Sequence, residues 1–124
     1  MRIRKKSGKR YDPVEKIDTQ SPTLLYNLSF PGGLTMVRAH VFFSGTVQGV
    51  GFRYTTQCMA VELQLTGWVK NLPDRRVEAL IEGPKDSIDK LLLRLRGHFK
   101  SYLHDIQVNW SDAQGNFKKF TVSC

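Results

Sequence analysis

The run SGTVQGVGFR at residues 44–53 joins two segments of different hydrophobic period, and this change of period decides how the chain folds. Before the run, apolar residues alternate from Val37 to Phe43, which is typical of a strand with one buried face. After it, apolar residues recur at three- and four-residue spacing from about residue 52 to residue 63, which predicts an amphipathic helix. Three glycines within the run let the backbone turn between the two elements.

The rest of the chain continues with strands and helices. Residues 66–71 and 76–82 read as strands and flank Leu72-Pro73-Asp74-Arg75, a turn marked by its Pro and Asp, so they predict a hairpin. Pro84 is expected at the first position of a second helix, which Gly97 closes. Further strands are expected near residues 106–110 and 120–124. This order predicts an α+β, ferredoxin-like split βαβ sandwich (βαββαβ plus a short fifth strand), with two helices on one face of an antiparallel sheet.

Length and charge distribution predict a single domain. The chain has 124 residues, 40% of them hydrophobic, which is enough for one compact core. Residues 1–36 carry seven Lys or Arg against three acids and show no helical or strand period. We therefore expect a disordered basic extension over residues 1–35 and one domain over residues 36–124. Gly32-Gly33, shortly before Met36, matches a ribosome-binding sequence read in frame, so we hypothesise that Met36 is the natural start.

Composition disfavours several classes of protein. No apolar run approaches the roughly 20 residues that cross a bilayer, and the basic start is not followed by the apolar stretch of a secretory signal. We expect a cytoplasmic protein with no membrane partner. Cys58 and Cys124 lie too far apart for a metal-binding spacing and are too few for a disulfide scaffold. The chain has a net charge of +8, but its basic extension lacks the regularly interleaved aromatic residues of a nucleic-acid platform. We therefore expect small phosphorylated anions, and not nucleic acid, as partners.

The glycine run has the composition of an anion-binding loop. It leads into a helix N-terminus, where unpaired amides and the positive end of the helix dipole favour a phosphate. Arg53, at the start of that helix, offers a planar fork that can bind two phosphate oxygens. The run lacks the ending of a nucleotide P-loop, and Tyr54 stands where a dinucleotide fingerprint needs its third glycine. From the residues alone, a tight turn with Arg53 as an ordinary exposed cation is an equal alternative.

Two separate blocks of the sequence resemble the acylphosphatase family. Residues 45–53 resemble its signature, Gly-x-Val-Gln-Gly-Val-x-Phe-Arg, and match every fixed position. The second block is TGWVKN at residues 66–71, continuing through Leu72-Pro73-Asp74 to Val77-Glu78-Ala79. The likeness extends from about Val37 to Val122. It implies an enzyme that hydrolyses acyl phosphates, which are anhydrides of a carboxylate and phosphate, to the carboxylate and inorganic phosphate.

The resemblance also implies roles for individual residues. Arg53 would bind the phosphoryl group together with backbone amides of the loop, and Asn71 would orient the attacking water; without the resemblance, Asn71 would be an ordinary backbone cap. The implied binding residues are Gln48, Gly49, Val50, Gly51, Phe52 and Arg53. The family uses no metal ion or organic cofactor, which suits a carboxylate leaving group that departs without a strong acid. We expect a monomer that acts on a small-molecule acyl phosphate.

Two other functions remain open. One is a non-catalytic anion-binding or regulatory module of the same fold, with its basic extension contacting nucleic acid. The other is a domain that acts on a carbamoyl phosphate-like intermediate in metallocentre assembly, as related domains do within longer chains, although the short length argues against it.

The sequence departs from the family pattern at two turns, where Gln64 and Arg75 replace the usual glycines. A side chain in left-handed backbone costs about 1 to 2 kcal/mol. We therefore expect these two positions to lower stability or to change the turn, without removing a catalytic group.

Overall fold

The computed structural model of the chain describes residues 35–123. Apart from Thr35, the predicted basic extension lies outside the described residues, as does Cys124. Within the described range the chain forms five strands and two helices in the predicted order. They are β1 (Met36–Gly45), α2 (Phe52–Glu62), β2 (Thr66–Asn71), β3 (Val77–Pro84), α3 (Lys85–His98), β4 (Leu103–Asp112) and β5 (Phe120–Ser123).

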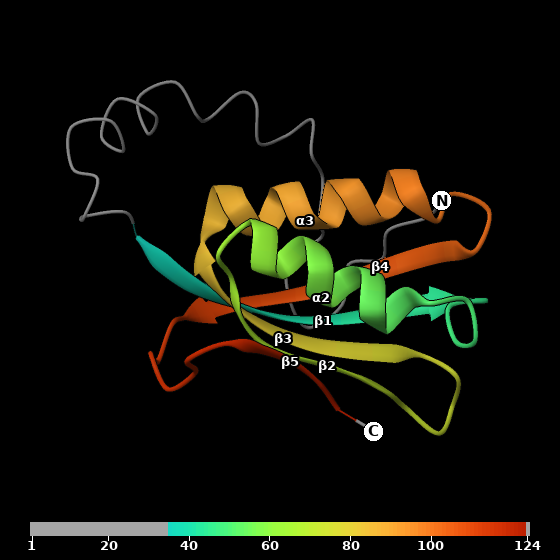
Figure 1. The fold of residues 1–124 in the computed structure, drawn as a ribbon, viewed down its shortest axis with the longest axis horizontal. Helices are drawn as coiled ribbons and strands as arrows, with labels where there is room; N and C mark the ends of the chain where they lie inside the picture. The colour runs from blue at the N-terminus through green and yellow to red at the C-terminus, as the bar shows by residue number, and fades with distance from the viewer. Residues whose placement is uncertain (1–34, 124) are drawn as a thin grey trace.

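The five strands form one sheet in the order β4-β1-β3-β2-β5, and both helices lie on the same face of it (Figure 1). The predicted two-layer, ferredoxin-like arrangement is confirmed. β1 pairs antiparallel with β3 and with β4, and β2 pairs antiparallel with β3. β5, in contrast, runs parallel to β2. The antiparallel prediction therefore holds for four strands, while the whole sheet is mixed, because the chain crosses from the β4 edge to the opposite edge before β5 begins.

The core lies between the helices and the sheet and fixes the start of α2. Phe43 of β1 and Phe52, the first residue of α2, are both buried, and their ring centroids lie 4.9 Å apart. The ring of Phe52 also contacts the ring of Phe99 just after α3, at 4.8 Å. Aromatic pairs at this separation add to the apolar burial that holds the elements together. The first turn of α2, which carries the candidate site, is thus anchored from both sides.

The ends of α3 differ from the prediction. Pro84 is not the first helical residue but the N-cap, with extended backbone (φ −63°, ψ 139°), because it still pairs with Met36 in the sheet. At the other end, Gly97 lies inside the helix, which ends at His98 with Phe99 as its C-cap. Phe99 is 4% exposed, so its packing in the core fixes the helix end without a glycine.

The two positions where glycine was expected adopt left-handed backbone. Gln64 has φ 59° after α2, and Arg75 has φ 79° in the β2–β3 hairpin; they are the only non-glycine residues with positive φ in the described range. The turns therefore keep the geometry that favours glycine while carrying a side chain, so both positions are strained.

Candidate active site

The connection between β1 and α2 carries the glycine run and is fixed at both ends. At its start, the Thr46 amide donates a hydrogen bond to the Tyr102 carbonyl at 2.8 Å, and Val47 is 1% exposed. At its end, Phe52 is 2% exposed. In Figure 1 this connection and the β2–β3 hairpin lie at the right-hand end of the molecule, and β5 runs beside β2 toward that end. Segments distant in sequence thus meet at one end of the sheet.

Within the connection, Gly49 and Gly51 turn the backbone toward α2. They have φ values of 80° and 82°, and a Cβ at either position would meet no atom within 4 Å. Backbone conformation, not lack of space, therefore favours glycine here. Gly51 is also the N-cap of α2, which has no side-chain cap and no acidic residue in its first turn. The positive end of the helix dipole is thus left without a carboxylate to offset it, which suits an anion.

Arg53 lies in the first turn of α2 and is half-buried. Its Nη1 donates a hydrogen bond to the backbone carbonyl of Ser123 in β5, at 2.9 Å. No described carboxylate forms an ion pair with it, although a guanidinium has five N–H donors. The contact with β5 holds the side chain in place and leaves most of its donors for a ligand.

Asn71 is the last residue of β2, and the alternation of that strand puts it on the helix-facing side together with buried Val69. Its Oδ1 is buried and has no hydrogen-bond partner among residues 35–123. Buried side-chain oxygens in folded proteins are nearly always hydrogen-bonded. This side chain therefore does not act as the backbone cap that its position at a strand end suggests, and it is a candidate to bind a ligand or water.

A cavity of about 310 Å³ brings these features together. Arg53 and Asn71 both line it, although they lie on different elements. The lining residues are Val47, Gly49, Gly51, Phe52, Arg53, Tyr54, Gln57, Asn71 and Val122. Of the predicted binding residues, Gln48 and Val50 are not among them: the side chain of Gln48 turns to the hairpin, and Val50 packs against the core. Their predicted contribution is through backbone amides, and it stays a prediction.

The family model for acylphosphatases matches residues 39–122, which is more than half of the chain. The chain belongs to the acylphosphatase family. The acylphosphatase of Nostoc sp. is 46% identical over 81 residues, which cover 64% of this chain and 80% of the relative. The acylphosphatase of Chloroflexus aurantiacus is 42% identical over 90 residues, covering 72% of this chain and 98% of the relative. Among solved structures, the acylphosphatase of Bacillus subtilis superposes with a TM-score of 0.66 at 36% identity, covering 71% of this chain and 99% of the other.

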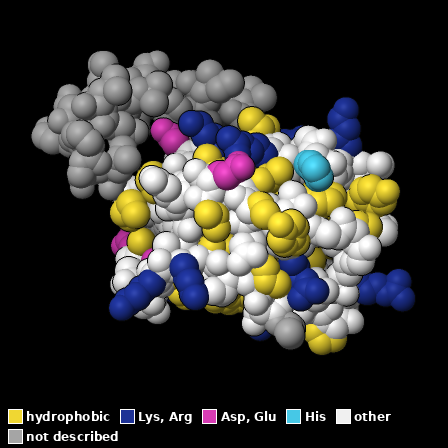
Figure 2. Space-filling view, in the orientation of Figure 1, with side chains coloured by type: hydrophobic (Ala, Val, Ile, Leu, Met, Phe, Trp, Pro, Cys, Tyr) yellow, Lys and Arg dark blue, Asp and Glu magenta, His cyan; other side chains and the backbone are white. Residues whose placement is uncertain are grey.

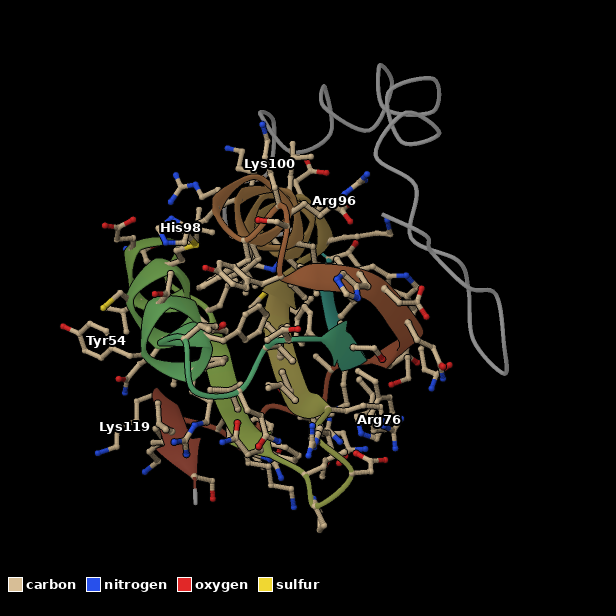
Figure 3. The ribbon with its side chains drawn as sticks, turned by 90° about the vertical axis from the view of Figure 1, so that its right-hand side faces the viewer. Tyr54, Arg76, Arg96, His98, Lys100 and Lys119 are labelled. Atoms are coloured by element: carbon tan, nitrogen blue, oxygen red, sulfur yellow. The ribbon has the colours of Figure 1, made fainter. Side chains whose placement is uncertain are left out.

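Four residues that line the cavity of this acylphosphatase family member were not predicted as site residues: Val47, Tyr54, Gln57 and Val122. Gln57 lies one helical turn after Arg53, a spacing that places both on one face of α2 and that could have revealed it. Val122 lies at the cavity because β5 pairs with β2, where Val122 is opposite Val69. This contact between distant segments leaves no local pattern in the sequence. Tyr54 projects from α2 into solvent at the site end of the molecule, shown in Figure 3, and is 69% exposed.

Local contacts shift the pKa values of two ionisable groups near the site, Tyr54 and Asp74. A hydrogen bond with Cys58 raises the pKa of Tyr54 above its ordinary value, so the phenol at the rim of the cavity is neutral at physiological pH. In the hairpin, Asp74 accepts hydrogen bonds from the Arg76 backbone at 3.1 Å and from Arg76 Nε at 2.8 Å. These contacts, the backbone bond foremost, hold the pKa of Asp74 below its ordinary value, so it is a carboxylate paired within the turn.

The described part of the chain offers no cluster for a metal ion: no three His, Cys, Asp or Glu side chains lie close enough to share one. The expectation that no metal ion or cofactor takes part stays a prediction. Neither α2 nor α3, the helices of residues 35–123, is long and apolar enough to cross a bilayer.

Proposed function

We propose that this protein is an acylphosphatase that hydrolyses acyl phosphates, using Arg53 and the loop amides to bind the phosphoryl group and Asn71 to orient the attacking water. The observation that carries the proposal is the cavity that Arg53 and Asn71 share at the uncapped start of α2. Family membership over residues 39–122 supports the reaction class. In this proposal, residues 36–124 form the catalytic domain. We also propose that the protein is cytoplasmic and monomeric.

Phosphate binding follows from the donors at the start of α2. The backbone amides of residues 48–53 would surround the phosphoryl oxygens, and the Arg53 guanidinium would bind two of them. The Ser123 carbonyl, which accepts from Arg53 Nη1 at 2.9 Å, orients the guanidinium before the substrate arrives. Donors fixed in advance stabilise the charge on the phosphoryl oxygens in the transition state without reorganising during reaction.

The chemical step needs only a positioned water. The Asn71 amide would hold a water in line with the bond between phosphorus and the acyl oxygen. The water oxygen forms the new bond to phosphorus, and the bond to the acyl oxygen breaks. The carboxylate leaves with the electron pair, and the proton of the water is released with the phosphate product. A carboxylate is a good leaving group, so no general acid is required.

The alternative of a non-catalytic module is not favoured. Asn71 lines the same cavity as Arg53, and an uncharged amide beside the phosphate-binding arginine suits the orientation of a water. On the face shown in Figure 2, the Lys and Arg side chains of the described residues lie in separate groups and form no continuous basic strip. A strip of that kind is what a nucleic-acid backbone follows.

The proposal is tested by hydrolysis assays on chelator-treated protein. Benzoyl, acetyl and carbamoyl phosphate form the panel, and Arg53→Ala is the inactive control. We expect turnover of at least one substrate by the wild type and inhibition by inorganic phosphate. Binding of phosphate without turnover of any of the three would instead show a binding module, and activity that returns only on adding a metal ion would show that the metal-free prediction is wrong.

A further inference from the structure

The side chain of Gln48 joins the two halves of the site. Its Nε2 donates hydrogen bonds to the Leu72 carbonyl at 2.8 Å and to the Arg76 carbonyl at 3.0 Å. Leu72 and Arg76 flank the turn of the β2–β3 hairpin, whereas Gln48 belongs to the glycine loop. One amide group therefore bridges the loop that would bind phosphate and the hairpin that carries Asn71.

The two carbonyls that accept from Gln48 also close the hairpin itself. The Arg75 amide donates to the Leu72 carbonyl at 3.1 Å, and the Leu72 amide donates to the Arg76 carbonyl at 2.8 Å. Each carbonyl oxygen can accept two hydrogen bonds, and the NH₂ group of Gln48 has two hydrogens to donate. The two N–H groups of the Gln48 amide thus supply the second hydrogen bond to each of these two carbonyl oxygens.

The hydrogen bonds of Gln48 join the glycine loop, which is anchored in the core, to the more exposed turn of the β2–β3 hairpin. The glycine loop is anchored in the core by Val47, 1% exposed, and by Phe52, 2% exposed. The turn of the hairpin, in contrast, has exposed residues at Pro73, Asp74 and Arg75. Segments with few buried contacts open at low free energy. Loss of the bridge should therefore release the hairpin and leave the loop in place.

Asn71 directly precedes Leu72, whose carbonyl Gln48 binds. We propose that Gln48 is a positioning residue that sets the place of the Asn71 amide relative to the phosphate-binding loop. This inference rests on the proposed role of Asn71 in the hydrolysis. Gln48 does not line the cavity with its side chain and does not act on the substrate through it; its side chain acts through the hairpin.

Steady-state kinetics of Gln48→Met and Gln48→Glu test the proposal. Both replacements approximate the length of Gln but donate no hydrogen bond, and the carboxylate in the second would face two carbonyl oxygens. We expect kcat to fall about 10- to 100-fold, because a misplacement of about 1 Å costs that much, while the inhibition constant for inorganic phosphate changes less than about twofold. Gln114→Met makes the same change on the exposed β4–β5 connection and should keep kcat. A phosphate inhibition constant that rises in parallel with the loss of kcat would overturn the proposal.

A double-mutant cycle with Asn71→Ala separates positioning from a structural role. If Gln48 acts through Asn71, Gln48→Met should cost little further activity once Asn71 is alanine, so the two effects are strongly non-additive. Effects that multiply would show that Gln48 contributes independently of Asn71, contrary to the proposal.

Amide hydrogen exchange provides a readout that does not depend on activity. In Gln48→Met, exchange of the Leu72 and Arg75 amides should accelerate about tenfold or more, while the Phe43 amide in the core keeps its rate. Unchanged exchange in the hairpin would overturn the proposal even if kcat falls. If the wild type hydrolyses no acyl phosphate, the proposed function fails, and this measurement alone decides whether Gln48 holds the hairpin.

Discussion

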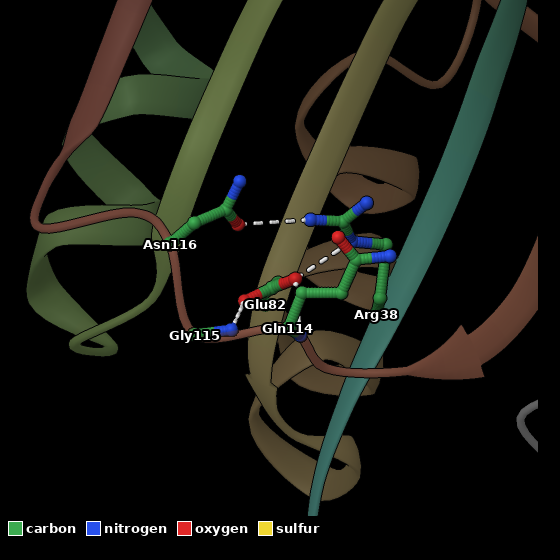
Figure 4. A network of polar contacts seen from close by, with 5 residues as sticks. All are labelled: Arg38, Glu82, Gln114, Gly115 and Asn116. Atoms are coloured by element: carbon green, nitrogen blue, oxygen red, sulfur yellow. Dashed lines mark hydrogen bonds and ion pairs between the residues drawn. The ribbon is translucent and has the colours of Figure 1, made fainter.

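The two ends of β3 carry polar regions of opposite character. Near one end, the carboxylate of Glu82 is 4% exposed and has partners for both oxygens. Oε2 accepts from Arg38 Nε at 2.6 Å and from the Gln114 amide at 3.0 Å, and Oε1 accepts from the Gly115 amide at 3.0 Å (Figure 4). At the other end, where the hairpin joins β3, the buried Oδ1 of Asn71 has no partner among the described residues.

The fully paired region around Glu82 contributes to stability, whereas the region around Asn71 is proposed to serve activity. Burial alone would raise the pKa of Glu82, but the two amides and the Arg38 guanidinium outweigh it and hold that pKa below the ordinary value of 4.5. The paired carboxylate thus binds the β4–β5 connection to the sheet. At the site, donors and acceptors left without internal partners cost stability and remain available to a ligand. Substitutions at the site should therefore change activity, and substitutions around Glu82 should change stability.

Arg53→Ala should have the largest effect and should fall on activity. Removing the guanidinium takes away the main positive charge facing the phosphoryl group, so kcat/KM should fall by about 10³-fold or more. Inhibition by inorganic phosphate should disappear, and the melting temperature should stay close to that of the wild type. The measurement combines benzoyl phosphate kinetics with thermal unfolding.

The matched control for this change is Arg53→Lys, which keeps the positive charge but loses the two-pronged contact. It should also be a poor enzyme. Activity within tenfold of the wild type in Arg53→Ala would contradict the assigned role.

Asn71→Ala should have the next largest effect, again on activity alone. Loss of the group that orients the water should lower kcat by about 10²-fold, while inhibition by inorganic phosphate stays nearly unchanged. The free energy of unfolding should not fall, because the side-chain oxygen that is removed has no partner within residues 35–123. Kinetics, phosphate inhibition and urea unfolding measure the three quantities. A weakened phosphate inhibition with unchanged kcat would show that Asn71 binds the phosphoryl group instead.

Glu82→Gln should show the opposite pattern, with a loss of stability and no loss of turnover per folded molecule. It removes the charge that Arg38 pairs with, and a buried ion pair broken on one side costs about 3 kcal/mol. Urea unfolding at neutral pH measures this cost. The matched control is Glu62→Gln, which breaks an exposed pair with Arg94 and should cost about 0.5 kcal/mol or less. Equal losses in the two variants would show that the Glu82 contacts add no stability beyond a surface pair.

The features predictable from the sequence are those with a local signal. The period change around residues 44–53 and the two family blocks were sufficient for the fold and for placing Arg53 and Asn71 in one candidate site. Contacts between distant segments left no such signal: the parallel pairing of β5 with β2, the Ser123 carbonyl that orients Arg53, and the bridge from Gln48 to the hairpin. The start of α3 was misplaced by one residue for the same reason, since sheet pairing with Met36 keeps Pro84 extended.

The smallest effects should come from Gln64→Gly and Arg75→Gly, which act at turns and on neither polar region. Both residues have left-handed backbone, with φ 59° and 79°. Glycine takes up this conformation without a Cβ penalty, so each change should add about 1 kcal/mol to the free energy of unfolding and raise the melting temperature. Turnover should change little.

Alanine at the same two positions isolates the backbone term. Gln64→Ala and Arg75→Ala remove the original side chains but keep a Cβ in the left-handed region, so they should not reproduce the gain. A rise in melting temperature as large in the alanine variants as in the glycine variants would assign the cost to the side chains. Lower melting temperatures in both glycine variants would contradict the strained-turn interpretation, because entropy lost by glycine would then outweigh the strain that it relieves.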